Sequence, residues 1–489
     1  MCDYKKMNLK KLIKYYKEMA LPAKAGIWFL ICNFLQKGLA AITTPIYTRI
    51  LTTAEYGQVS VFYSWQDIFL IFITFGLSSV VFSRGLIQYE KNQKEYSSIM
   101  AGLSISTTGI SFVFYAFFSK TMSGVLGFEQ VVLIYIYSFF YTIIEFWSQL
   151  QRVNYKYMSF VIMTIVMTIA KPLLSISLIL AIPFAHVQIR VLSDVVVMII
   201  IGIPVMLTIF ANGKRFYVKS IWRESLMFVI PLIPHYLSQR ILSQSDRIMI
   251  SNIIGDREAG IYSLAYSVGM LLMLINTALD STMSPWVFRK LRDKEYKRIQ
   301  EVTQSLIIFF ALCALSFILI IPELVKIFAS SEYYEAIYIV PIIAISSYFI
   351  YLYVQFIYFE YYIGKTKYIT IATGMSAVMN IILNYIGLQT FGYVAAAYTT
   401  FICYALYALF HYIVMKKLCK KELYVEIVYN GKFLVGISAG VILCGLTSMM
   451  FYRLFIIRLI VAGIVIAVTL RYAVNIMNTI GHKAAVVEK

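Results

Sequence analysis

Long apolar segments alternate with short polar ones along almost the whole chain. An apolar stretch of about 20 residues crosses a bilayer as a helix, and about fourteen such stretches can be marked. The predicted spans are residues 24–47, 58–83, 98–119, 127–150, 158–181, 188–211, 225–251, 258–287, 303–323, 335–360, 368–388, 391–415, 432–452 and 455–475. The polar connections are too short to hold a folded domain. The pattern predicts an all-α polytopic membrane protein whose function lies in the membrane.

The composition supports this class. Hydrophobic residues make up 60% of the 489 residues, charged residues only 14%, and the mean hydropathy is +0.77, whereas soluble proteins average about 25% charged residues. If both termini are cytoplasmic, the inward segments hold 31 Lys and Arg residues, the outward loops 6 and the spans 6. This distribution follows the positive-inside rule. The net charge of +19 therefore indicates topology in a cell membrane, not a nucleic-acid partner.

An internal repeat divides the chain. TTAEYGQVSVFYS (52–64) follows the first span, and GDREAGIYSLAYS (255–267) follows the seventh. The matching pairs are Glu55 and Glu258, Gly57 and Gly260, Ser60 and Ser263, Tyr63 and Tyr266, and Ser64 and Ser267. Because an even number of spans separates the copies, the repeat predicts two parallel six-helix lobes. We expect a basic amphipathic N-terminus (1–23), an N-lobe (24–212), a C-lobe (213–415), and an accessory helix pair with a cytoplasmic tail (416–489).

The seventh predicted span is unusually polar. From His235 to Arg247, nine of thirteen residues are polar. At about 100° per residue, His235, Gln239 and Asp246 fall near one line of a helix, and Arg240 and Arg247 form a second. Charges deep in a bilayer cost at least about 2.5–3.5 kcal/mol, so they face a water-filled cavity or a partner. The alternative is that Asp246 and an arginine only pin two helices together.

Two prolines precede this polar stretch. Pro231 and Pro234 remove backbone hydrogen bonds and favour a kink, which predicts a hinge at the start of the polar helix.

Other basic residues lie within predicted spans. Lys37 in the first and Arg190 in the sixth could join Arg240 and Arg247 in a cavity that suits a phosphate-bearing substrate. The alternative for Arg190 is an ion pair with Asp194 four residues later on the same helix. The alternative for Lys37 is that its long side chain reaches the membrane surface.

Two asparagines share one face of the eleventh span. Asn380 and Asn384, with Asp246 and either Thr399 or Thr400, offer the hard oxygens that Na⁺ prefers. Hydrogen bonding between helices is the alternative interpretation.

Signatures of enzymes are missing from the sequence. The GKT at 364–366 has Phe359 where a phosphate-binding loop needs its first glycine. The four histidines are scattered, and the six cysteines form no CxxC. The sequence therefore predicts a protein that is not an enzyme, with no cofactor and no metal beyond a coupling ion.

Several of these segments together resemble a known family. PIYTRILTTAEYGQVSVFYS (45–64), DREAGIYSLAYS (256–267) and QSDRIMI (244–250), with the fourteen-span plan, are similar to the Wzx-type polysaccharide-repeat-unit flippases of the multidrug/oligosaccharidyl-lipid/polysaccharide exporter superfamily. The resemblance covers essentially the whole chain. It implies two lobes forming a V around a cationic cavity, an accessory helix pair, and alternating access. The implied substrate is an undecaprenyl-diphosphate-linked oligosaccharide, moved from the inner to the outer leaflet of the cytoplasmic (inner) membrane for capsule or O-antigen synthesis.

The resemblance also implies site residues and partners. The Na⁺ site of the related lipid II flippases would correspond to Asp246, Asn380, Asn384, Ala396 and Thr400. Asn384 stands where those flippases have an acid, which leaves Na⁺ and H⁺ both open. Only Lys37 partly matches their first-span arginine cluster, which favours a different glycan-lipid. Implied partners are membrane lipids and the polymerase and chain-length machinery.

Two rival functions fit parts of the sequence. A drug or cation antiporter of the same fold would need carboxylates in the cavity, where this chain has basic residues. A membrane glycosyltransferase or polymerase would need a large outward loop, and all the predicted outward loops are short.

Overall fold

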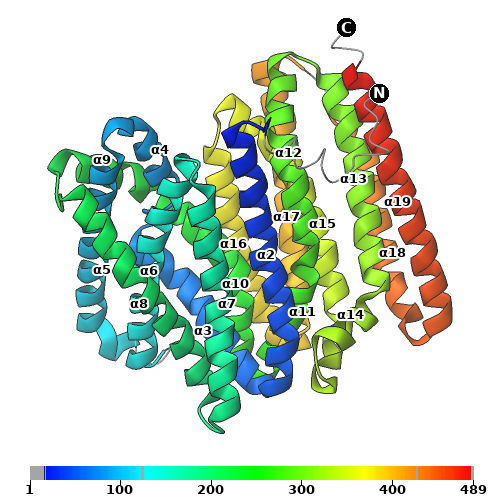
Figure 1. Cartoon of the computed structure of the whole chain (residues 1–489). Helices are drawn as coiled ribbons and strands as arrows, with labels where there is room; N and C mark the ends of the chain where they lie inside the picture. The colour runs from blue at the N-terminus through cyan, green and yellow to red at the C-terminus, as the bar shows by residue number, and fades with distance from the viewer. Residues whose placement is uncertain (1–15, 17, 123–125, 426–427, 486–489) are drawn as a thin grey trace. The chain divides into compact units, whose positions relative to one another are not determined.

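The computed structural model describes residue 16 and residues 18–122, 126–425 and 428–485 (Figure 1). Within these ranges the ordered elements are helices, with no strand. The predicted all-α class is confirmed. Most of the predicted amphipathic N-terminus (1–23) lies outside the described residues.

The long helices follow the predicted spans closely. They are α2 (Leu21–Ile50), α3 (Thr53–Thr74), α4 (Val80–Gln88), α5 (Gln93–Met122), α6 (Phe128–Val153), α7 (Tyr157–Ala181), α8 (His186–Gly213), α9 (Lys219–Val229), α10 (Ile233–Ile253), α11 (Asp256–Gly269), α12 (Met273–Arg292), α13 (Tyr296–Leu319), α14 (Ile321–Phe328), α15 (Val340–Ile363), α16 (Lys367–Phe391), α17 (Ala395–Leu418), α18 (Gly431–Ser448) and α19 (Phe455–Ala485). Short 3₁₀ turns interrupt the sequence of helices, among them η3 (Ile230–Leu232), η4 (Met270–Leu272), η5 (Ser331–Tyr338) and η7 (Met449–Arg453), and a π-helical turn, η6 (Cys419–Leu423), follows α17.

In the described part of the chain, twelve helices are long and apolar enough to cross a membrane, with α11, η4 and α12 counted as one. Each coincides with a predicted span. The two remaining predicted spans, 58–83 and 225–251, are also helical but do not meet this hydropathy criterion. The second of them contains α10, the polar helix that the sequence singles out.

The chain forms two compact units. The first contains residues 1–43 and 66–236, and the second contains residues 44–65 and 237–489. In the first unit α8 packs against α5, α6 and α7, around a core that includes Phe82, Met100 and Phe146. The predicted lobe boundaries at 212/213 and 415/416 differ from this division and remain a prediction.

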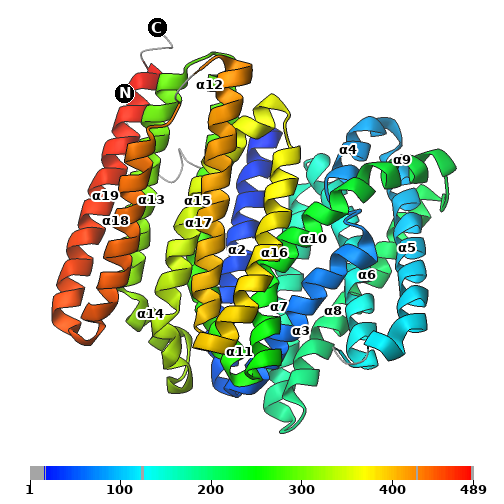
Figure 2. The same cartoon turned by 180° about the vertical axis from the view of Figure 1, so that it is seen from behind.

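The central helix of the second unit is α15. It packs against α11, α12, α13, α17 and α18, and its residues are buried on all sides, as expected for a helix that is apolar around its whole circumference. Pro341 lies in its first turn, and Gly364, with a φ of +76°, ends it. Both views show α18 and α19 beside α13 (Figures 1 and 2).

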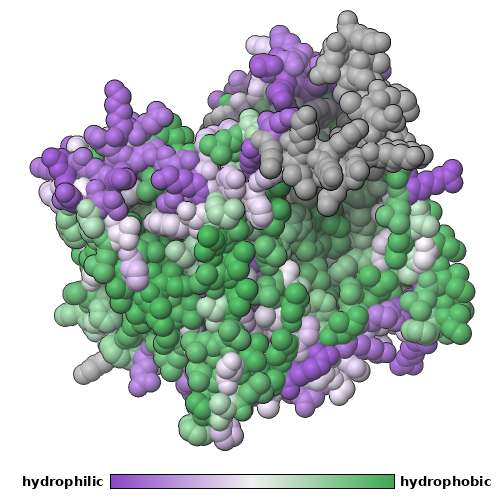
Figure 3. Space-filling model, in the orientation of Figure 1, coloured by the Kyte–Doolittle hydropathy of each residue, from purple (hydrophilic) through white to green (hydrophobic). Residues whose placement is uncertain are grey.

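The surface fits a bilayer environment. Many large apolar side chains are exposed on the helices, such as Ile42, Phe117 and Leu180. On the face shown in Figure 3, apolar residues cover the sides of the helices, and hydrophilic residues gather towards the helix ends. An exposed apolar surface of this extent marks contact with lipid.

The two copies of the repeat contact each other at their equivalent glycines. Both Gly57 on α3 and Gly260 on α11 belong to the second unit. A Cβ at Gly57 would lie 1.9 Å from the carbonyl oxygen of Asp256, and a Cβ at Gly260 would lie 2.0 Å from that of Thr53. The backbones therefore touch in a nearly symmetric crossing. This contact explains why residues 44–65 group with the second unit.

A buried arginine joins α19, the last helix of the chain described, to the short helix α14. Arg458 on α19 is 2% exposed, and its two terminal nitrogens each donate to the Glu323 carboxylate at 2.5 Å. It also donates to the Leu319 carbonyl oxygen at 2.6 Å. These bonds hold the pKa of Glu323, on the short helix α14, below its usual value.

We expect Arg458→Met to lower the free energy of unfolding by about 2 kcal/mol, because the half-buried Glu323 carboxylate loses two hydrogen bonds from a charged donor. A carboxylate with a lowered pKa stabilises the fold above its unfolded pKa, and this stability is lost as the pH falls through the folded pKa. Acidification should therefore reduce the melting temperature of the wild type more than that of Arg458→Met. The control is Arg453→Met, at an exposed arginine on η7. Equal melting temperatures for both variants would contradict this role.

Candidate functional site

Asp246 on α10 is the centre of a buried polar cluster in the second unit. The residue is 1% exposed. Its Oδ1 accepts a hydrogen bond from Asn384 Nδ2 at 2.6 Å. Its Oδ2 accepts from Thr400 Oγ1 at 2.7 Å and from the Tyr262 hydroxyl at 2.6 Å. One carboxylate thus ties α10 to α11, α16 and α17.

Asn380 on α16 links the other residues of the cluster by hydrogen bonds. Its Oδ1 accepts from Ser245 Oγ at 2.9 Å and from Asn384 Nδ2 at 3.1 Å, and its Nδ2 donates to Thr400 Oγ1 at 3.4 Å. Thr399 donates to Asn384 Oδ1 and, at 3.0 Å, to the Ala396 carbonyl oxygen.

The structure brings all five predicted coupling residues together. The cluster offers one carboxylate, two amide oxygens, hydroxyls and a carbonyl oxygen, which are hard ligands suited to a proton or a monovalent cation. Among the described residues, no group of three or more His, Cys, Asp or Glu side chains could hold a metal ion. In the observed arrangement, interhelical hydrogen bonds occupy the carboxylate. The role of the cluster in cation coupling remains a prediction.

Tyr262 is the member that the sequence analysis missed. It is 0% exposed and donates directly to the carboxylate. Its only signal in the sequence was its place in the repeated segment, four residues before the matched Tyr266.

Arg247, next to the centre, has no carboxylate partner among the described residues. It is 9% exposed and donates to Gln244 Oε1 at 2.7 Å and to the Ser243 carbonyl oxygen at 3.0 Å. Its guanidinium lies 4.3 Å from the centroid of the Tyr266 ring. The alternative in which Asp246 pairs with an arginine is therefore not seen; amide and hydroxyl groups meet the carboxylate instead.

The first half of α10 is the accessible half. Gln239 is exposed, and His235 and Arg240 are partly exposed. No acidic residue occurs from 225 to 245. This part of the helix therefore presents polar and positive groups.

The other two predicted basic residues lie in the first unit. Arg190 Nη1 contacts Asp194 Oδ1 at 2.5 Å, which is the pairing given as the alternative from the sequence. Lys37 belongs to α2, but its side chain is outside the described part of the structure. A substrate-binding role for either residue remains a prediction.

The predicted hinge coincides with a break in the helix. Residue Pro231 lies in the 3₁₀ turn η3 between α9 and α10, and Pro234 lies in the first turn of α10. The boundary between the compact units follows at 236/237, and another falls at 43/44, beside Pro45 of α2. The hinge function itself remains a prediction.

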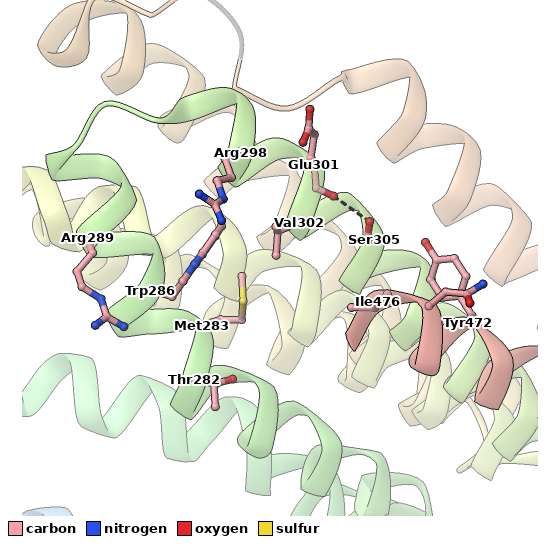
Figure 4. A pocket seen from close by; sticks show the side chains of 11 residues that line it. Thr282, Met283, Trp286, Arg289, Arg298, Glu301, Val302, Ser305, Tyr472 and Ile476 are labelled. Carbon is pink, nitrogen blue, oxygen red and sulfur yellow. Dashed lines mark hydrogen bonds between the residues drawn. The ribbon is translucent and has the colours of Figure 1, made fainter. Parts of the chain in front are cut away.

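A pocket of about 390 Å³ lies among α12, α13 and α19 in the second unit. Figure 4 shows Arg298 pointing towards Trp286, with Met283 and Val302 beside them and Tyr472 on α19 across the pocket. Just outside the spans, Lys290 and Arg298 hold the pKa of Glu295 below its usual value. The lining combines an apolar wall with two basic groups, Arg289 and Arg298, and one acid, Glu301.

Sequence comparison identifies the family. The profile of the family described as "Polysaccharide biosynthesis protein" matches residues 23–291, more than half of the chain. The chain belongs to this family. A second profile, MatE, matches residues 231–386, which include α10 and both asparagines of the cluster.

Curated relatives of this family member are distant. "Lsg locus putative protein 1" of Haemophilus influenzae is 22% identical over 180 residues, covering 34% of this chain and 43% of that protein. An "Uncharacterized membrane protein" of the same organism is 24% identical over 173 residues, with the same coverage. The chain thus spans about two fifths of the length of these relatives.

Solved structures show the same fold. The inward closed conformation of the lipid II flippase MurJ aligns with a TM-score of 0.63 and 14% identity, over 93% of this chain and 99% of that one. An inward-facing MATE multidrug transporter of the MOP superfamily aligns with a TM-score of 0.58 and 14% identity, over 79% and 96%. The protein is a multi-pass membrane protein with the fold of these transporters and flippases.

Proposed function

We propose that the protein is a flippase for undecaprenyl-diphosphate-linked oligosaccharide repeat units. It moves them by alternating access from the inner to the outer leaflet of the cytoplasmic membrane, with both termini in the cytoplasm. The product feeds the synthesis of a surface polysaccharide, a capsule or an O-antigen, through a polymerase and its chain-length partner. The family and the fold support a transporter of this kind.

One observation carries the choice of substrate: the accessible half of α10 is polar and basic and has no carboxylate. Sugars and a diphosphate cannot cross about 30 Å of hydrocarbon without polar partners. Arg240 supplies a planar, permanently charged group that pairs with phosphate oxygens, and Gln239 and His235 can hydrogen-bond hydroxyls. The pocket beside Arg298 suits an amphiphile, since its wall is apolar and its two arginines, which outnumber the single acid Glu301, can meet an anionic head.

The Asp246 cluster is the proposed coupling site, for Na⁺ or H⁺. A cation there would replace the hydrogen bonds that join α10 to α11, α16 and α17, so binding would favour one arrangement of these helices over another. Pro231 and Pro234 would absorb the bending of the polar helix.

A drug or cation antiporter is the second candidate, because the MatE profile covers the polar helix and the asparagines. A cationic drug needs an exposed carboxylate. Asp246 is the first acid of α10, and it is buried and already accepts three hydrogen bonds. We therefore favour the anionic substrate.

The test is mass spectrometry of polyprenyl-linked sugars in a deletion strain, with sidedness read by a membrane-impermeant sugar probe. We expect a complete, unpolymerised repeat unit to accumulate on the cytoplasmic side. Arg240→Ala should lower translocation about tenfold or more, because a hydrogen bond to a charged group contributes about 1.5–3 kcal/mol, and Arg240→Lys should restore part of it. Arg223→Ala, at an exposed arginine of α9, is the matched control.

Other outcomes have clear meanings. An absent or truncated lipid-linked unit would indicate an assembly enzyme. An unchanged lipid pool together with increased drug sensitivity would favour the antiporter.

A further inference from the structure

A second pocket lies at the ends of three membrane-spanning helices of the second unit. It has a volume of about 590 Å³ and is formed by the start of α13, the end of α17 with the turn η6, and the start of α18. All three helices are long and apolar enough to cross a membrane. Their ends place the pocket at the level of the lipid headgroups. It shares no lining residue with the pocket beside Arg298.

The pocket carries positive charge. Lys416 of α17 and Lys432 of α18 line it, and none of the described residues that line it is acidic. Both lysines are exposed. The nearest acid along the described chain, Glu422 of η6, pairs with Lys365 at 3.6 Å. Two like charges on the wall of one cavity favour an anionic ligand.

The polar groups of the lining include hydrogen-bond donors. Asn430 Oδ1 accepts from the backbone N–H groups of Lys432 at 3.0 Å and Phe433 at 3.4 Å. The carbonyl end of this amide is thus occupied, and its Nδ2 is the end left to donate to a ligand. Tyr412 adds a hydroxyl that comes close to Gly431, where a Cβ would lie 2.8 Å from it. Donors beside lysines suit phosphate oxygens, which accept.

The floor of the pocket is apolar and firmly held. Met415, Cys419, Val428 and Tyr429 line it and are 1–3% exposed. The Tyr429 hydroxyl donates to Thr303 Oγ1 of α13 at 3.4 Å, which ties the segment before α18 to α13. A small soluble anion would leave this apolar floor unfilled. A phospholipid head, with its glycerol backbone and the first carbons of its chains, can cover both the floor and the charged wall.

We propose that this pocket binds the headgroup of an anionic phospholipid from the surrounding membrane. The phosphate pairs with Lys416 and Lys432 and accepts hydrogen bonds from Asn430 and Tyr412. A zwitterionic headgroup brings its own cation, which the two lysines repel, so lipids with a net negative charge are preferred. The bound lipid joins the ends of α13, α17 and α18. This site does not depend on the proposed function, because the lipid stays in its leaflet.

The site is tested on the full-length protein in detergent by native mass spectrometry. The protein is titrated with phosphatidylglycerol and with phosphatidylcholine of the same acyl chains, and bound lipids are counted. Each lysine near an anionic lipid contributes about fivefold in affinity. We therefore expect the first phosphatidylglycerol to bind about 20- to 30-fold more tightly than the first phosphatidylcholine. Lys416→Gln combined with Lys432→Gln should remove most of this preference.

The matched control is Lys417→Gln combined with Lys421→Gln. It changes the net charge equally, at exposed lysines that do not line the pocket, and should keep the preference. Gly431→Ala provides a second test that leaves the charge unchanged. Its new Cβ would lie 2.8 Å from the Tyr412 hydroxyl, which narrows the pocket, and we expect severalfold weaker binding of phosphatidylglycerol.

Three results would overturn the proposal. Equal losses in the two double-lysine variants would show only a diffuse positive surface. Equal affinities of the wild type for the two lipids would exclude a site that selects anionic headgroups. Displacement of phosphatidylglycerol by an excess of inorganic phosphate would indicate a pocket for a soluble anion. The comparison of lipids on the wild type decides even if a variant does not fold, and no readout requires transport.

Discussion

Asp246→Asn is expected to abolish translocation, so that the lipid-linked repeat unit accumulates as in a deletion strain. The amide keeps the size of the side chain but replaces one acceptor oxygen with a donor. At Oδ1 the new donor would face Asn384 Nδ2, which can only donate; at Oδ2 it would face the hydroxyls of Thr400 and Tyr262, whose hydrogens would have to turn to other acceptors. A buried donor opposite a donor costs about 1–3 kcal/mol. The substitution also removes the only carboxylate of the cluster, which a coupling cation requires.

Folding and transport have to be measured separately for this variant. The melting temperature in detergent reports the loss of hydrogen bonds, and complementation with lipid analysis reports transport. Asp293→Asn, at an exposed acid between α12 and α13, should behave as the wild type in both. Full complementation by Asp246→Asn would remove the cluster from the transport cycle, and Arg240 and the substrate proposal would be unaffected.

The sequence predicts the features that depend on local pattern. Twelve predicted spans reappear as apolar helices, and the polar seventh span reappears as α10. Asn380 and Asn384 lie on one face because a spacing of four residues puts them there. That face contacts Asp246, as the residue types and the family resemblance together had suggested. Helical periodicity therefore predicts well which residues share one face of a helix.

Contacts between distant helices were harder to predict. Glu360 and His411 are 51 residues apart, and they meet only because of the register between α15 and α17, which no local pattern encodes. Glu360 stood at the end of a predicted span, where an acid normally faces water. Arg458 stands near the outward start of the predicted span 455–475, yet it is buried against Glu323. Whether a charged residue near a helix end is buried or exposed therefore depends on which neighbouring helix packs against it.

The internal repeat was also predicted only in part. Gly57 and Gly260 were matched by position, but nothing in the sequence placed them in contact. The structure shows that each glycine lies against the backbone next to the other. A contact between equivalent positions of two copies is self-complementary, like a two-fold interface. This explains why both copies carry glycine there.

Gly57→Ala and Gly260→Ala are expected to disrupt this crossing. The new Cβ atoms would lie 1.9 and 2.0 Å from backbone carbonyl oxygens, and a backbone atom cannot rotate away as a side chain can. The helices α3 and α11 must therefore separate, at about 1–3 kcal/mol for each variant. Once one alanine has separated the two helices, the Cβ of the second alanine encounters a smaller steric clash. The double variant should accordingly lose less stability than the two single losses combined.

Thermal unfolding of the four proteins in one detergent forms the required double-mutant cycle. The control is Gly436→Ala on α18, where a Cβ would meet nothing within 4 Å. That variant should be neutral or gain about 0.5–1 kcal/mol, because alanine loses less backbone freedom on folding. Additive losses at 57 and 260 would mean that the two glycines do not share one contact. Coupled losses, together with reduced translocation in both single variants, would show that the two halves of the repeat must approach this closely during the transport cycle.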